Sequence, residues 1–289
     1  MELIKTTVAT DSNQATLYLG DAISMMRELP DNSFDLSIID PPYGASSSAS
    51  WSLPAHHGVS GFGGEWSITS ETWDTLSGLE SFTMTLAYLS EVKRLVRPTG
   101  SLFIHSTYHN SGIVNVVCQM LGIEILNEII WFKRNAFPNL ANRRLTASHE
   151  TIHWAHTGTS KSRKYRFNAE AVKSAYWESD GLKARGKQMR TVWDIPNNKQ
   201  PVELADGKHP TQKPLSVASR LLLMAGTTGG ELLVPFAGSG TEMVAGLQYG
   251  MNVTGFELEQ EYFDLSSRRL KRQKLQAENS LPIAIEIAA

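Results

Sequence analysis

The chain has 289 residues, which is enough for one large or two medium domains and for a substantial buried core. Its 41% hydrophobic and 19% charged residues exclude a disordered chain and a membrane protein, and its formal net charge of −2 argues on average against a strongly basic nucleic-acid binder. The single cysteine, Cys118, excludes an intrachain disulfide and a cysteine-based zinc site, and without a secretion signal we expect a reducing, intracellular setting.

The N-terminal third begins with alternating strands and helices. A short strand is expected at residues 16–19, followed by an amphipathic helix that begins after the N-cap residue Asp21 and ends near residue 29. The apolar run 34–39 predicts a buried parallel strand that ends at Asp40-Pro41-Pro42-Tyr43. Residues 45–77 are rich in Ser, Gly and Trp and show no period, so we interpret them as a long surface loop, with its tryptophans either in a mobile lid or as ordinary loop anchors.

The same alternation continues to the end of the chain, interrupted once. Helices are expected at 79–96, 112–121, 214–225, 242–249 and 260–274, and strands at 101–105, 124–133, 150–155, 231–234 and 252–257. This pattern predicts an α/β domain with a Rossmann-like, doubly wound, mostly parallel sheet, which also contains an antiparallel strand pair and a small insertion.

The interruption coincides with a basic segment that the net charge conceals. Residues 133–190 contain thirteen Lys and Arg against four Asp and Glu, a net of +9, which leaves −11 for the rest of the chain. Such a segment is typical of a surface that binds a polyanion, although a solvated insertion has the same composition.

A glycine turn between a late strand and helix indicates a cofactor site. In the run Pro235 to Thr241, two glycines allow the backbone to approach a ligand, and the next helix offers free N–H groups. Glu257 follows Phe236 by about 20 residues, a spacing suited to a carboxylate that binds ribose hydroxyls. Because Met243 interrupts the dinucleotide fingerprint, we expect a cofactor with a single nucleoside.

The earlier Asp40-Pro41-Pro42-Tyr43 turn combines hydrogen-bond acceptors with an aromatic face. Two prolines fix the backbone and remove two N–H donors, which leaves a carboxylate, a carbonyl and a ring in a rigid array. Such an array suits a planar group that carries an NH2, as in pockets that receive an extruded base, whereas a plain polar proline turn is the simpler interpretation.

Together these motifs resemble the β-class S-adenosylmethionine-dependent DNA amino-methyltransferases. The similarity extends from about residue 16 to 270 and follows the β-class order, with Asp40 to Tyr43 first, His209 to Pro214 next and Pro235 to Thr241 last. The resemblance implies base flipping. Asp40 and the Pro41 carbonyl would accept hydrogen bonds from the target amino group, Pro42 would complete the turn, and Tyr43 would stack on the base.

The resemblance also implies S-adenosyl-L-methionine as the cofactor and no metal. Asp21 is expected at the adenine, Glu257 at the ribose, and Thr211 with Lys213 at the carboxylate. The complete implied cofactor site consists of Asp21, Ala22, His209, Thr211, Lys213, Pro235, Phe236, Gly238, Ser239, Gly240, Thr241, Glu257 and Leu258.

By the same resemblance, residues 1–157 form the catalytic half of the domain, 158–207 the target recognition region, 208–275 the cofactor-binding half and 276–289 a tail. Double-stranded DNA is the implied partner, and whether a cognate restriction endonuclease is a second partner stays open. The protein could be a monomer or a homodimer. We expect it to be cytoplasmic and associated with the nucleoid. The expected DNA contacts are Lys133, Arg143, Arg144, Lys161, Arg163, Lys164, Arg166, Lys183, Arg185, Lys187 and Arg190.

In this family an Asp at position 40 goes mostly with adenine-N6 methylation, which makes N6 the primary expectation for this enzyme and cytosine-N4 the alternative. The family's glycine motif usually opens with Asp, and here Val234 occupies that position. Reduced cofactor affinity, or a DNA-binding relic without turnover, is therefore a second alternative, and an RNA methylase is a third.

Overall fold

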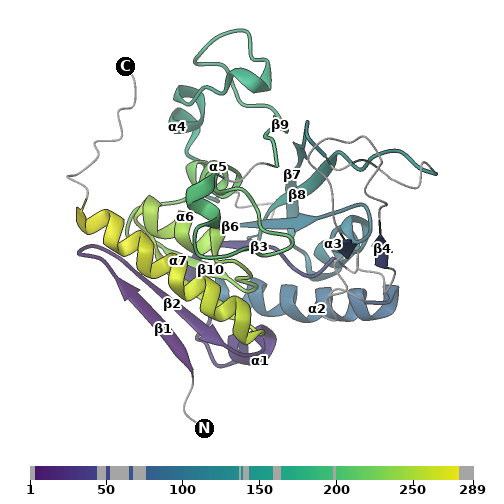
Figure 1. The fold of residues 1–289 in the computed structure, drawn as a ribbon. Coiled ribbons are helices and arrows are strands. Elements are labelled where there is room, and N and C mark those ends of the chain that lie inside the picture. The colour runs from purple at the N-terminus through teal and green to yellow at the C-terminus, as the bar shows by residue number, and fades with distance from the viewer. Residues whose placement is uncertain are drawn as a thin grey trace.

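The protein is described by a computed structural model that covers residues 4–43, 50–52, 65–67, 76–136, 138, 143–158, 164–197 and 200–279. A nine-stranded sheet forms its centre, in the order β1-β2-β11-β10-β3-β6-β8-β7-β9 (Figure 1). Its strands are β1 Lys5–Ala9, β2 Gln14–Leu19, β3 Phe34–Ile39, β6 Val96–Ser106, β7 Glu124–Phe132, β8 His149–His156, β9 Val192–Asp194, β10 Glu231–Val234 and β11 Asn252–Glu257.

The expected mostly parallel sheet with antiparallel pairing is confirmed. Strands β2, β11, β10, β3 and β6 are parallel neighbours, whereas β8 is antiparallel to both β6 and β7. A separate two-stranded ribbon, β4 Ser50–Ser52 with β5 Glu65–Ser67, lies within the stretch that we expected to be a loop. Such three-residue strands are too short to give the sequence a recognisable period.

Helices cover both faces of the sheet, as a doubly wound fold requires. They are α1 Ala22–Arg27, α2 Gly78–Leu95, α3 Ser111–Leu121, α4 Ala169–Ser174, α5 Leu215–Ala225, α6 Thr241–Tyr249 and α7 Gln260–Asn279, with short 3-10 turns at Glu178–Asp180 and Pro201–Leu204. Successive residues of β10 point to opposite faces: Leu232 packs in the core beneath α5 to α7, and Leu233 packs in the core beneath α1 to α3.

Most predicted elements are found within a few residues of their expected bounds. One difference lies inside the sheet, because β6 begins at Val96 and not at residue 101, and the others lie at the sheet edges. β1 was not expected, because only Val8 in it is buried and the strand shows little alternation. It pairs with β2 at one edge, and α7 lies along both strands (Figure 1). α7 also continues past residue 274, where we expected it to end, to Asn279.

Part of the expected target recognition region, residues 158–207, belongs to the sheet. β9 pairs in parallel with β7, and its Trp193 is buried in the same core as α5. A buried ion pair fixes the preceding turn, because Arg220 of α5 lies 2.7 Å from Asp180 and stacks 3.9 Å from the Trp177 ring centroid. None of the helices in the described ranges is long and apolar enough to cross a membrane.

Candidate active site

The two motifs that the sequence singled out lie at one edge of the sheet. β3 and β10 are parallel neighbours, so the Asp40 turn after β3 and the glycine turn after β10 leave the sheet side by side. The connections from these strands run to opposite faces, which makes this edge a topological switch point, where open α/β sheets bind ligands. A cavity of about 270 Å³ lies there, between the two turns.

Most of the expected site residues line this cavity. All four residues from Asp40 to Tyr43 do so, as do the expected cofactor residues other than Gly240 and Thr241. Gly240 instead shapes the turn: its φ of +75° favours glycine, and a side chain there would meet Ser266 at 3.0 Å. The lining residues from the expected cofactor site are Asp21, Ala22, His209, Thr211, Lys213, Pro235, Phe236, Gly238, Ser239, Glu257 and Leu258.

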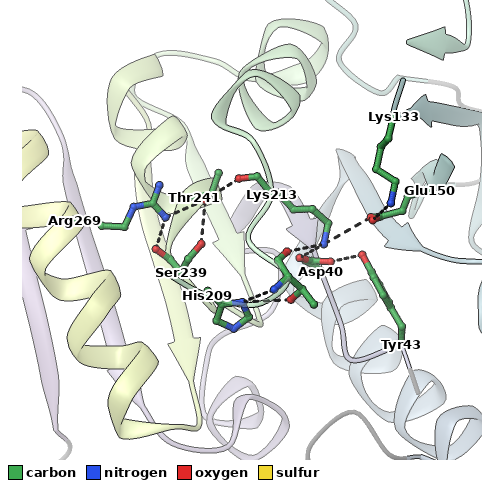
Figure 2. Close-up of polar contacts among 10 residues, drawn as sticks. Asp40, Tyr43, Lys133, Glu150, His209, Lys213, Ser239, Thr241 and Arg269 are labelled. Atoms are coloured by element: carbon green, nitrogen blue, oxygen red, sulfur yellow. Dashed lines mark hydrogen bonds and ion pairs between the residues drawn. The ribbon is translucent and has the colours of Figure 1, made fainter. Parts of the chain in front are cut away.

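At the catalytic end of the cavity, Asp40 is held by two partners. The Tyr43 hydroxyl donates a hydrogen bond to its Oδ1, and the Lys213 ammonium donates to its Oδ2 at 2.7 Å (Figure 2). Lys213 also lies 3.8 Å from Glu150, which in turn accepts a hydrogen bond of 2.9 Å from Lys133. Two acids and two lysines therefore form one connected network.

The network keeps Asp40 ionised although it is buried. Burial by itself opposes the charge and is the largest single effect, but the charge of Lys213, the nearby His105 and the hydrogen bonds from Lys213 and Tyr43 together outweigh it, so the pKa of the Asp40 carboxyl is lowered. The pKa of Lys213 is raised, because Asp40 and Glu150 together outweigh the effect of its own burial. Burial and the neighbouring Asp40 charge raise the pKa of Tyr43, so its hydroxyl keeps its proton.

Two lysines have partners that the sequence did not indicate. We expected Lys213 at the cofactor carboxylate, yet its ammonium is directed at Asp40. We expected Lys133 on DNA, yet its side chain is largely buried and paired with Glu150. Glu150 was not singled out, because a lone Glu at the start of a strand carries no motif, and only the antiparallel placement of β8 brings it beside Lys213.

At the cofactor end, carboxylates and rings surround the glycine turn. Glu257 accepts hydrogen bonds from the backbone N–H groups of Gly238 at 2.7 Å and of Glu259 at 2.9 Å. Asp21 caps α1 by accepting from the Ser24 N–H at 2.8 Å, which confirms it as the N-cap. The His209 and Tyr262 rings meet edge to face, with centroids 4.1 Å apart. Each carboxylate retains lone pairs for a ligand hydroxyl or amine.

The lining of the cavity is strongly acidic. Its carboxylates outnumber its single lysine, Lys213, and its single histidine, His209. A lining of this kind attracts a cationic ligand and repels phosphates. The lining carboxylates are Asp21, Asp40, Glu242, Glu257 and Glu259.

Sequence reasoning missed Glu242 and His105. Glu242 lies in the first turn of α6 and lines the cavity, and its position directly after the glycine turn was the available signal. His105, near the end of β6, is buried close to Asp40, and burial lowers its pKa to about 4, so it is neutral at pH 7. Val234, where an acid was expected, is fully buried in the apolar core.

The other expected DNA contacts lie on the surface of the described chain. Arg144 donates a hydrogen bond of 3.0 Å to the Tyr108 hydroxyl, Arg185 lies over the Tyr176 ring, and Arg190 donates to the Asp180 carbonyl. The exposed residues are Arg143, Arg144, Lys164, Arg166, Lys183, Arg185, Lys187 and Arg190. Lys161, Arg163, Trp73 and the side chains of Trp51 and Trp66 lie outside the described residues.

Comparison with known proteins identifies a family and a relative that agree with each other. A family model described as DNA methylase matches residues 34–268. The type II methyltransferase M2.DpnII of Streptococcus pneumoniae is 33% identical over 265 residues, which cover 91% of this chain and 92% of the relative.

Two solved structures share the fold. A Thermus thermophilus protein in complex with S-adenosyl-L-methionine is 25% identical, with a TM-score of 0.57 over 89% of this chain and 95% of that one. The cytosine-N4-specific PvuII DNA methyltransferase superimposes with a TM-score of 0.67 over 97% of this chain and 98% of that one. Because its identity is only 16%, that second likeness concerns the fold alone.

Proposed function

This chain belongs to the N6/N4 DNA methylase family, and we propose that it methylates the N6 amino group of adenine in duplex DNA. It is a DNA methyltransferase that depends on S-adenosylmethionine. The observation that carries the proposal is the shared cavity: the Asp40 to Tyr43 turn and the glycine turn before α6 face each other across one acidic space.

The residues around this cavity fit S-adenosylmethionine. The ligand is cationic at its sulfonium and ammonium groups, and it meets a lining in which carboxylates predominate. A carboxylate oxygen of Glu242 is buried there without a hydrogen-bond partner in the described chain. Glu257 and Asp21 would hold the nucleoside part, and the turn from Gly238 would hold the methionine part. When bound, the cofactor supplies an electrophilic methyl group.

Asp40 and Tyr43 would receive the target base. The ionised Asp40 accepts N–H hydrogen bonds from the amino group and stabilises the positive charge that develops on its nitrogen. Both Asp40 oxygens already have partners, Tyr43 and Lys213, so the base has to displace at least one of them. Displacing the Tyr43 hydroxyl leaves the Lys213 ion pair intact and frees the ring to stack on the base. Catalysis then rests on positioning and on a preset charge.

The basic segment would hold the DNA. Its exposed cations suit phosphate contacts, which give affinity and salt dependence, and single arginines among them suit a guanine edge. We assign target recognition to residues 158–207, part of which joins the sheet through β9. A cognate restriction endonuclease and association with the nucleoid belong to the same proposal, because M2.DpnII is named a type II methyltransferase and the substrate is DNA.

A methyl-transfer assay tests the proposal. The full chain is incubated with duplex DNA and tritiated S-adenosylmethionine, and the DNA is digested to nucleosides for chromatography. We expect the label in N6-methyladenine. Label in N4-methylcytosine would replace adenine by cytosine as the substrate, and label found only with RNA would replace DNA. DNA binding without any transfer would identify a relic that has lost its activity.

A further inference from the structure

Glu242 is a buried carboxylate that forms no ion pair within the described residues. It follows Thr241 at the start of α6, its residue is only 4% exposed, and it lines the cavity. Its Oε1 has no hydrogen-bond partner in the described part of the chain. A buried carboxylate without a partner costs folding free energy, so its presence in a ligand cavity calls for a ligand that pairs with it.

The cations near Glu242 direct their hydrogen bonds and ion pairs to other groups, and the Nε of Arg269 has no hydrogen-bond partner in the described chain. Lys213 lies between Asp40 and Glu150, and Lys133 pairs with Glu150. Arg269 of α7 directs its Nη1 to the Ser239 carbonyl at 2.5 Å and to the Thr241 hydroxyl at 3.0 Å (Figure 2). Within the described residues, no cation forms an ion pair with Glu242 at 4 Å or less.

The electrostatics of the cavity point in the same direction. Burial and the charge of Asp40 raise the pKa of Glu242 to about 7, although Lys213 and Arg269 act to lower it. Tyr43, a further titratable neighbour, keeps its proton. The carboxyl group is therefore partly protonated near neutral pH, and a cationic ligand beside it would drive out the proton.

We propose that Glu242 is the carboxylate that binds the positively charged methionine end of S-adenosylmethionine. The inference rests on the proposed function. Val234 precedes the glycine turn at the end of β10, and Glu242 follows the turn at the start of α6. Glu242 therefore supplies the negative charge that is missing at position 234. The cofactor site therefore contains an acid although position 234 is Val, and the chain binds its cofactor with ordinary affinity.

The proposal predicts discrimination between cofactor and product. S-adenosylmethionine carries a net charge of +1, whereas the demethylated product S-adenosylhomocysteine is neutral overall. A carboxylate at this end of the cavity therefore favours the cofactor over the product, and it does so most above the pKa of Glu242. Release of the neutral product is correspondingly easier.

Calorimetric titration of the full-length Glu242→Gln variant tests the proposal. The amide has the same shape as the protonated acid, and Glu261→Gln, an exposed α7 position outside the cavity, is the matched control. At pH 7.5 we expect Glu242→Gln to weaken S-adenosylmethionine binding at least five-fold, with a smaller loss for S-adenosylhomocysteine and no change in the control. A loss below five-fold, or an equal loss for both ligands, would overturn the proposal.

A second measurement uses the wild-type protein and needs no variant to fold. Titration with S-adenosylmethionine at pH 6.5, in two buffers of different ionisation enthalpy, counts the protons released on binding. We expect roughly three quarters of a proton per cofactor, because about that fraction of a group with a pKa of about 7 is protonated there. Release near zero overturns the role of Glu242. Wild-type protein that does not bind the cofactor at all overturns the proposed function instead.

Discussion

Charged residues around the cavity and the exposed cations of the basic segment are organised in opposite ways. Around the cavity, Asp40, Glu150, Lys213 and Lys133 are largely buried and joined at hydrogen-bond or ion-pair distances. In the basic segment, Lys183, Arg185 and Lys187 are exposed to solvent. Buried charges are held in a fixed geometry and interact strongly enough to shift pKa values. Exposed charges interact through a field that salt screens, which attracts a polyanion without fixing its register. The two regions should therefore respond differently to substitution, pH and salt.

The largest expected effect concerns the cavity. Asp40→Ala removes the acceptor for the target amino group, and we expect methyl transfer to fall about 1,000-fold, because a preset charge at the reacting centre is lost. DNA binding, measured by fluorescence anisotropy, should be retained, since the exposed cations are unchanged. Normal methylation by this variant would show that the catalytic assignment of Asp40 is wrong.

The second effect concerns the buried ion pair that Asp180, in the basic segment, forms with Arg220 of α5. Asp180→Ala leaves Arg220, which is 2% exposed, without its partner at 2.7 Å, and we expect the free energy of unfolding to fall by about 3 kcal/mol. Glu170→Ala breaks the exposed Lys173 pair in the same segment and serves as the control, with no measurable change. Equal thermal shifts in the two variants would contradict the contrast between buried and exposed charges.

The third effect is a pH shift at the cavity. Lys213 lowers the pKa of Asp40 against the effect of burial, so Lys213→Met should raise that pKa. Any protonation of Asp40 removes the charged acceptor, so we expect methyl transfer to fall several-fold at pH 7 and to recover as the pH rises. Lys213→Arg keeps the charge and should keep the wild-type profile. A loss of equal size at every pH would mean that Lys213 does not act through Asp40.

The smallest effect belongs to the exposed cations. Replacing Lys183, Arg185 and Lys187 by Ala should reduce the slope of log affinity against log salt by about 2 to 3, because each phosphate contact contributes roughly 0.9. Lys271→Ala, on the exposed surface of α7, is the control and should leave the slope unchanged. An unchanged slope in the triple variant would remove these residues from the DNA-binding surface.

Much of the fold was predictable because its signals are local. The bounds of β3, β10 and β11 match the expected ranges, since a compact apolar run between turn residues specifies a buried strand without help from distant residues. The edges were less predictable: β1 buries only one residue, and β9 contributes three residues to the sheet from within a segment read as an insertion. Such strands depend on a neighbouring strand for their hydrogen bonds, and local sequence patterns do not identify which strand that is.

The same division applies to the site. The sequence by itself determined the two turns, because the Asp40 motif and the glycine turn are contiguous and their chemistry is confined to a few adjacent residues. Only the tertiary structure decided the partners of Lys213 and Lys133 and the isolation of Glu242, because those depend on which strand ends meet at one edge of the sheet. Electrostatic interaction depends on distance and burial, and neither quantity follows from separation along the chain.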